Sequence, residues 1–184
     1  LLRISIPYRI YGGLRFYERL EIKNAIAYLK IIFNNSDNPS FERSISNPTR
    51  GVGEKTLGKI RQTAQKYNIS YIKASAKLID EGSISGRGGS GLRDYLEFVA
   101  GCKSFIEENS LSDLMELIIK ESGLYSYHAK EAGEKGKTRT ENLEELITAT
   151  KNFEQSIREE KTNAEIAENY LDVISLDAGD RQAS

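Results

Sequence analysis

Two stretches of helical periodicity are joined by the segment Asn47-Pro48-Thr49-Arg50-Gly51-Val52-Gly53-Glu54-Lys55-Thr56-Leu57. This segment decides how the middle of the chain folds. Two glycines bracket one apolar residue, and the next helix is expected to run from about Glu54 to Tyr67. This pattern predicts a helix-hairpin-helix motif, because glycine allows a tight turn and lets a phosphate approach the main chain without a Cβ in the way. The N–H groups and positive dipole end of the second helix would face the same point.

A hairpin of this kind would contact the sugar–phosphate backbone of a nucleic acid rather than the bases. Lys55 and Thr56 would add a positive charge and a hydroxyl group in the first turn of the helix, and Arg50 precedes the glycines. An ordinary glycine-rich connection between two helices is the alternative that the segment leaves open.

Outside this segment, apolar residues at helical spacing predict helices over most of the chain. The fold class is therefore all-α: a compact multi-helix domain with helix-hairpin-helix motifs. In the first half of the chain the expected helices are residues 18–33, a short helix with Asn38 as N-cap, residues 54–67 and residues 70–80. A long helix containing Leu92 to Ile106 follows, and then one that begins at a cap on Ser110 and ends at Gly123. The last two helices are expected to begin at the capping boxes Thr138–Glu141 and Thr162–Glu165.

The two ends of the chain have sequence patterns that differ from the helical periodicity of its middle. Residues 6–11 form the only strand-like run, which Gly12 and Gly13 end. Because a single strand needs a partner for its backbone groups, this run is expected to be unpaired here and to belong to a larger protein. The polar tail from Asp177 to Ser184 is expected to fray.

Two further glycine-rich stretches share the composition of the first hairpin. Residues 85–90 contain Gly86 and Arg87, and residues 136–139 contain Lys137, Thr138 and Arg139. Each offers amides, hydroxyl groups and cations ahead of a helix, although a flexible linker is the favoured interpretation of either stretch alone. The whole run from Gly82 to Gly91 is expected to be a flexible break.

Charge and cysteine content narrow the class of protein. The formal net charge of −1 argues against nucleic acid, but the average conceals a basic stretch. Between residues 43 and 61 the basic residues are Arg43, Arg50, Lys55, Lys59 and Arg61, and the only acid is Glu54. The single cysteine, Cys102, excludes an internal disulfide and fits a reducing cytoplasm. No apolar run approaches a membrane span of about 20 residues, and no signal peptide is visible.

The sequence shows no constellation of residues that would support catalysis. His128 is the only histidine and is expected to be a surface or packing residue. Cys102 lies on an apolar helix stripe, and no His/Cys cluster could hold a metal. The P-loop spacing is absent, so we expect no ATP-binding and no metal site in this chain.

Three segments resemble the UvrD/Rep/PcrA family of superfamily-one DNA helicases. The first is residues 6–19 followed by Glu21-Ile22-Lys23, the second is residues 47–57, where the family usually has Gly-Ile-Gly, and the third is residues 133–139 followed by 141–146. The resemblance covers residues 6–153 and weakens from Glu154 onward. It implies that residues 1–14 end the second RecA-like motor domain, that residues 15–176 form the helical 2B accessory subdomain, and that residues 177–184 lead back to the motor.

The same resemblance implies a function. The parent protein would be a bacterial, cytoplasmic, nucleoid-associated ATP-dependent 3′-to-5′ DNA helicase acting in DNA repair, with ATP and Mg²⁺ bound elsewhere. This chain would bind duplex DNA at a single-strand/double-strand junction and regulate the motor. Repair proteins or a second helicase copy are further candidate partners. The residues implied as DNA contacts are Thr49, Arg50, Gly51, Val52, Gly53, Lys55, Thr56, Gly86, Arg87, Lys137, Thr138 and Arg139. A protein-interaction module whose hairpins are purely structural is the alternative.

Overall fold

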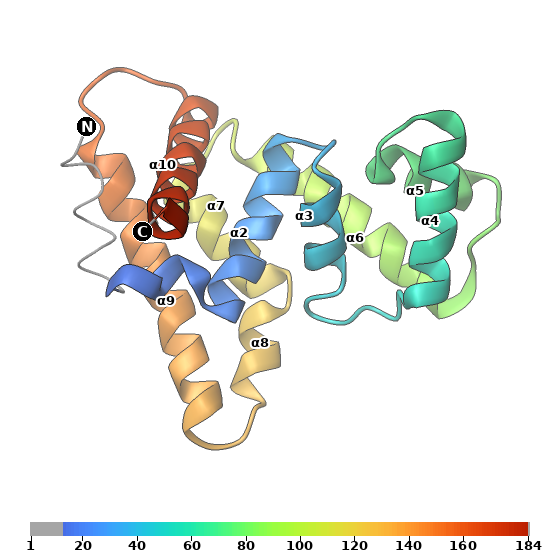
Figure 1. Ribbon diagram of the computed structural model, residues 1–184, viewed down its shortest axis with the longest axis horizontal. Coiled ribbons are helices and arrows are strands. Elements are labelled where there is room, and N and C mark those ends of the chain that lie inside the picture. Colours follow the sequence, from blue (N-terminus) through green and yellow to red (C-terminus); the bar gives the residue numbers. More distant parts are fainter. Residues whose placement is uncertain (1–12, 184) are drawn as a thin grey trace. The chain divides into compact units, whose positions relative to one another are not determined.

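The computed structural model describes residues 13–183 and shows an all-α protein, as predicted (Figure 1). Within that range every regular element is a helix. In chain order the elements are the 3₁₀ helix η2 (Gly13–Glu18) and the α-helices α2 (Leu20–Phe33), α3 (Asn38–Ile45), α4 (Glu54–Tyr67), α5 (Tyr71–Asp80), α6 (Gly86–Phe105), α7 (Leu111–Glu121), α8 (Leu124–Ala129), α9 (Gly133–Ser156) and α10 (Asn163–Ala183). The strand-like run 6–11 and its expected lack of a partner lie outside the described residues.

The chain divides into two compact units, which we call the central unit and the terminal unit. The central unit is Ala27–Lys103, and the terminal unit combines Leu1–Ile26 with Ser104–Ser184. In the central unit α4 and α5 pack against each other, and α3 packs against α5. The largest fully buried side chains of this unit include Tyr28, Phe41 and Tyr95. Its core is therefore aromatic, and two of its rings carry hydroxyl groups.

Polar residues fix the helix starts of the central unit. The carboxylate of Asp37 accepts a hydrogen bond from Ser40 N at 3.1 Å, so Asp37 is the N-cap of α3 and the prediction of Asn38 was wrong by one residue. Pro39 still lies in the first turn, where its missing N–H costs nothing. Ser70, the first residue of the predicted helix 70–80, is the N-cap of α5 and accepts a hydrogen bond from Lys73 N at 3.2 Å.

The terminal unit is built around α7, α8 and α9, which pack against one another, with α10 against α7, α9 and η2. Ser110 caps α7, and Gly123 follows that helix at φ +94°, both as predicted. The capping box at Thr162 and Glu165 is also confirmed, with reciprocal hydrogen bonds of 3.0 and 3.1 Å. These caps satisfy N–H groups that the helix itself cannot pair.

Two helix starts differ from the expectations. Helix α6 begins at Gly86, so only the first part of the run 82–91 is a loop. Helix α9 begins at Gly133, which places the expected capping box at Thr138 inside the helix. Helix α10 spans Asn163–Ala183, and the fraying expected of the tail from Asp177 stays a prediction. Some glycines of α6 and α9 reflect close packing: a Cβ at Gly136 would lie 2.4 Å from the carbonyl oxygen of Glu131, whereas one at Gly133 would meet nothing within 4 Å.

Candidate nucleic-acid interface

The loop between α3 and α4 holds the Gly51-Val52-Gly53 sequence in a defined conformation. Gly51 has φ +78°, in the left-handed region that favours glycine, and Val52 is buried with 9% of its surface exposed. Gly53 is the N-cap of α4 with φ −96°, a value that any residue adopts, and a Cβ there would meet nothing within 4 Å. The backbone therefore requires glycine at position 51 and not at position 53.

Helix α4 starts without a side-chain acceptor for its first N–H groups, unlike α3, α5 and α7. These N–H donors are satisfied by no side-chain cap, and together with the positive end of the helix dipole they can bind water or an anion. Lys55 is exposed in the first turn, and Thr56 is half-buried beside it. Helix α4 packs principally against α5, so the helix-hairpin-helix designation of the α3–α4 pair stays a prediction.

The start of α6 lies directly against this loop. A Cβ at Gly88 would lie 3.3 Å from Gly51 O and 3.4 Å from Thr56 Oγ1. The side chain of Arg87 passes Gly51, since a Cβ there would lie 2.8 Å from its Cγ. The structure thus brings together two of the three glycine-rich stretches singled out in the sequence, and Gly86 begins the second with φ +68°.

A closer contact joins α6 to the loop at Gly91. A Cβ at this position would lie 1.9 Å from the carbonyl oxygen of Arg50, closer than any real Cβ contact. The helix can approach the loop only because residue 91 has no side chain. Sequence reasoning assigned Gly91 to a flexible break and missed this role, for which the sequence gives no local signal.

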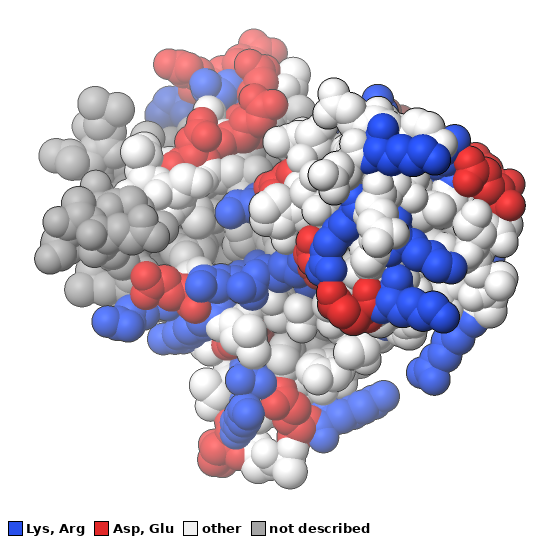
Figure 2. Space-filling model, turned by 45° about the vertical axis from the view of Figure 1, so that its right-hand side comes forward, with Lys and Arg blue, Asp and Glu red and all other residues white. Residues whose placement is uncertain are grey.

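The basic stretch between residues 43 and 61 offers fewer exposed cations than its composition suggests. The guanidinium of Arg61 lies 2.5 Å from carboxylate oxygens of both Glu42 and Glu54. The hydrogen bond to Glu42, followed by that to Glu54, raises the pKa of Arg61 above its ordinary value. Lys55 and Lys59 remain exposed. On the face turned forward in Figure 2, Lys and Arg side chains gather with acidic side chains between them.

Arg50 is oriented toward the core of the central unit. Its guanidinium carbon lies 5.7 Å from the ring centroid of Tyr28 and 5.6 Å from that of Tyr95. It also donates a hydrogen bond to the hydroxyl of Tyr28. Sequence reasoning placed Arg50 among the DNA contacts and did not anticipate these two aromatic partners.

The third glycine-rich stretch belongs to the terminal unit. Lys137 and Thr138 are exposed on the first turns of α9, which also begins without a side-chain cap. Arg139 is paired with Glu131 at 2.9 Å and lies 4.0 Å from Glu21. DNA contact by these three residues stays a prediction.

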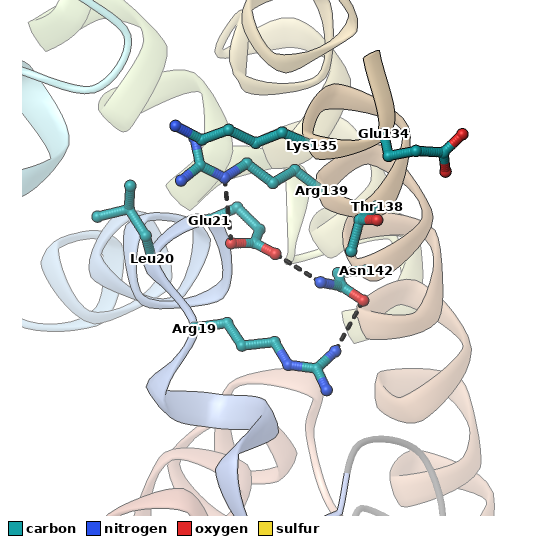
Figure 3. A pocket seen from close by; sticks show the side chains of 8 residues that line it. All are labelled: Arg19, Leu20, Glu21, Glu134, Lys135, Thr138, Arg139 and Asn142. Atoms are coloured by element: carbon teal, nitrogen blue, oxygen red, sulfur yellow. Dashed lines mark hydrogen bonds and ion pairs between the residues drawn. The ribbon is translucent and has the colours of Figure 1, made fainter. Parts of the chain in front are cut away.

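An open pocket of about 510 Å³ lies beside Arg139 in the terminal unit (Figure 3). Its wall is a row of polar side chains in which Asn142 donates to Glu21 at 2.6 Å and Arg19 donates to Asn142 at 2.8 Å. Glu21 is 3% exposed, so these partners compensate a carboxylate that has lost most of its water. The row joins the start of α2 to α9 and fixes two helices of this unit.

His128 and Cys102 are packing residues in the structure. His128 is 2% exposed, and its Nδ1 contacts Glu131. Cys102 is 1% exposed, and burial raises the pKa of its thiol to about 12.

Among the described residues there is no group of three or more His, Cys, Asp or Glu side chains that could hold a metal ion. None of the helices in residues 13–183 is long and apolar enough to span a membrane.

The central unit is thus a helical module in which a glycine-rich loop, an uncapped helix start and exposed cations meet, an arrangement suited to backbone phosphates. The sequence pattern of the UvrD-like helicase C-terminal domain matches residues 1–86. DNA helicase II of Escherichia coli (strain K12) is 42% identical over 183 residues, which is 100% of this chain and 25% of that protein.

Two relatives carry a different name. The ATP-dependent DNA helicase PcrA of Leuconostoc citreum is 33% identical over 160 residues, or 87% of this chain and 21% of the relative. The ATP-dependent DNA helicase PcrA of Bacillus subtilis (strain 168) is 30% identical over 182 residues, which is 99% of this chain and 24% of that relative. The likeness therefore extends past residue 153, beyond which sequence reasoning expected it to weaken. Together these matches support a place for the chain among the UvrD- and PcrA-type helicases, of which it spans about a quarter.

Proposed function

We propose that this chain is the 2B accessory subdomain of an ATP-dependent 3′-to-5′ DNA helicase and that it binds the backbone of duplex DNA. The observation that carries the proposal is the meeting of the Gly51-Val52-Gly53 loop with the start of α6, next to the uncapped start of α4. A phosphate placed there would meet main-chain N–H groups, the hydroxyl of Thr56 and the charge of Lys55.

The chemistry of this surface favours the phosphate backbone over the bases. Lys55 and Arg87 are exposed cations that would neutralise phosphates, and Gly51-Val52-Gly53 carry no polar side chain for a base edge. Binding is therefore expected to be weak, insensitive to base sequence and strongly dependent on salt. The second surface, formed by Lys137 and Thr138 at the start of α9, would extend the contact along the same duplex.

The rest of the helicase would supply the motor. Residues 1–14 would leave the second RecA-like domain, residues 15–176 would form the subdomain, and the tail from residue 177 would lead back. ATP and Mg²⁺ would be bound outside this chain, which would not hydrolyse ATP alone. The duplex next to a single-strand junction would be the substrate, the bacterial cytoplasm the location, and repair proteins or a second helicase copy the further partners.

A regulatory protein-interaction module is the second candidate, and specific pairings favour it. Arg61 and Arg139, which sequence reasoning counted as basic, are held by carboxylates, and the net charge of the chain is −1. In that case the glycine-rich loops would be structural connections only. The two functions differ in whether Lys55 contributes to DNA binding.

A pair of matched variants tests the proposal. Lys55→Ala removes an exposed lysine from the first turn of α4, and Lys66→Ala removes one from the last turn of the same helix. Fluorescence anisotropy with a short labelled duplex should show weaker binding for Lys55→Ala, equally for different base sequences, and parent-like binding for Lys66→Ala. Equal affinities of the parent and Lys55→Ala would favour the interaction module.

A further inference from the structure

We propose that Arg50 is a positioning residue of the DNA-binding loop rather than a phosphate contact. The inference rests on the proposed function and assigns this arginine a different part in it. Arg50 would hold the loop 46–53 in the conformation that presents Gly51, Val52 and the start of α4 to the duplex. Its own charge would stay against the aromatic core.

The side chain of Arg50 is held by two buried rings. Tyr28 and Tyr95 are both 0% exposed, and the guanidinium lies over both at cation–π distances. It also donates to the Tyr28 hydroxyl. These partners orient the guanidinium toward the core of the central unit and limit its freedom to turn toward a phosphate.

The Tyr28 hydroxyl extends this anchor to both ends of the turn. It lies 2.8 Å from the carbonyl oxygen of Ser44, at the end of α3, and 2.7 Å from that of Asn47, in the loop. It can donate its one proton to either carbonyl while accepting from Arg50. Burial raises the pKa of Tyr28 to about 12, so the hydroxyl keeps the proton with which it donates.

The backbone of Arg50 is held from the other side by α6. Its carbonyl oxygen is the atom that a Cβ at Gly91 would strike. Arg50 therefore contacts α2 and α6 through its side chain, and its carbonyl oxygen lies close against Gly91. Gly51, whose φ is +78°, follows immediately, so the anchor sets where the left-handed turn begins.

The test separates a phosphate contact from a positioning residue by the salt dependence of duplex binding. A lost phosphate contact reduces the slope of log K against log salt by about 0.9, and this result is expected for Lys55→Ala. Arg50→Ala should instead weaken binding roughly two- to tenfold, the cost of ordering one or two groups on binding, with the slope unchanged.

A second variant removes the anchor without touching charge. Tyr28→Phe deletes a buried hydroxyl, and it should weaken duplex binding at unchanged slope. The double variant with Arg50→Ala should lose less than the product of the two single effects, because both act through one contact. Hydrogen exchange of residues 46–53 in the DNA-free chain should be faster in each variant. Circular dichroism establishes that the helices are retained, and Tyr28→Phe carries the test if Arg50→Ala does not fold.

The outcomes that overturn the inference are distinct. A slope for Arg50→Ala that falls as it does for Lys55→Ala makes Arg50 a phosphate contact, and parent-like binding by folded Arg50→Ala or Tyr28→Phe removes its positioning role. Failure of the proposed function has another signature: the parent chain shows no salt-dependent binding, or Lys55→Ala binds as the parent does. That result overturns both proposals.

Discussion

Replacing Gly91 by alanine should displace the loop 46–53, which we propose binds DNA. The added Cβ would lie 1.9 Å from Arg50 O and 3.0 Å from Arg50 C, and both are backbone atoms that cannot rotate away. Real Cβ contacts essentially never fall under 3.0 Å, so the helix and the loop must separate by about 1 Å in a densely packed region. Overpacking of this kind costs about 1–3 kcal/mol, and a backbone clash places Gly91→Ala near the upper value.

Alanine also favours the helix, by about 1 kcal/mol over glycine. We therefore expect a net destabilisation of roughly 2 kcal/mol, or a fall in Tm of roughly 4–8 °C for a chain of this size. Gly101→Ala is the matched control, because Gly101 lies on the same helix and a Cβ there would meet nothing within 4 Å. That change should stabilise the chain by about 0.5–1 kcal/mol.

Urea and thermal unfolding followed by circular dichroism measure the change in stability of each variant. Titration of the folded proteins with duplex DNA measures whether displacement of the loop weakens binding. Gly91→Ala should be destabilised and should bind duplex DNA more weakly, while Gly101→Ala should bind as the parent does. If Gly91→Ala matches Gly101→Ala in both stability and binding, the close approach of α6 to the loop is refuted.

The two glycines of the hairpin should respond differently to replacement by alanine. Gly51→Ala should destabilise the chain by about 1 kcal/mol or more, because its φ of +78° strains any other residue. The free energy of unfolding of Gly53→Ala should be near that of the parent, because a Cβ there meets nothing within 4 Å. The hydrogen bond with His128 lowers the pKa of the Glu131 carboxyl below its ordinary value. This carboxyl therefore stabilises the fold at pH values above its unfolded-state pKa of about 4.5. The stabilisation is lost as the pH falls through the lower pKa of the folded state. Glu131→Gln should therefore flatten the acid side of a stability-against-pH curve, and an unchanged curve would exclude this linkage. Because burial raises the pKa of Cys102 to about 12, a thiol reagent at neutral pH should label it only after unfolding, and rapid labelling of the native chain would contradict its burial.

Local rules predicted most of the helices. Periodicity located α4 at Glu54–Tyr67, and the side-chain caps on Ser110 and Thr162 were assigned from residue type and spacing alone. These features depend on neighbours three or four residues apart, which a sequence displays directly. The glycine-rich starts of α6 and α9 were misassigned because glycine signals flexibility locally and close packing only in the folded chain.

The candidate site was predicted only in part. The sequence singled out Gly51-Val52-Gly53 and residues 86–87, but their meeting depends on Gly88 and Gly91, which contact residues 51 and 50 far away in the chain. Arg50 was grouped with surface cations because its aromatic partners, Tyr28 and Tyr95, lie 22 and 45 positions away. Pairing of this kind is set by tertiary packing, and no local pattern reports it.

The salt dependence of duplex binding by the parent chain tests the central claim most directly. Two hairpin surfaces that together contact some three to five phosphates should give a slope of log K against log salt of roughly −3 to −5, with the same value for duplexes of unrelated sequence. A slope near zero, or a preference of more than a few-fold for one base sequence, would contradict binding through the phosphate backbone.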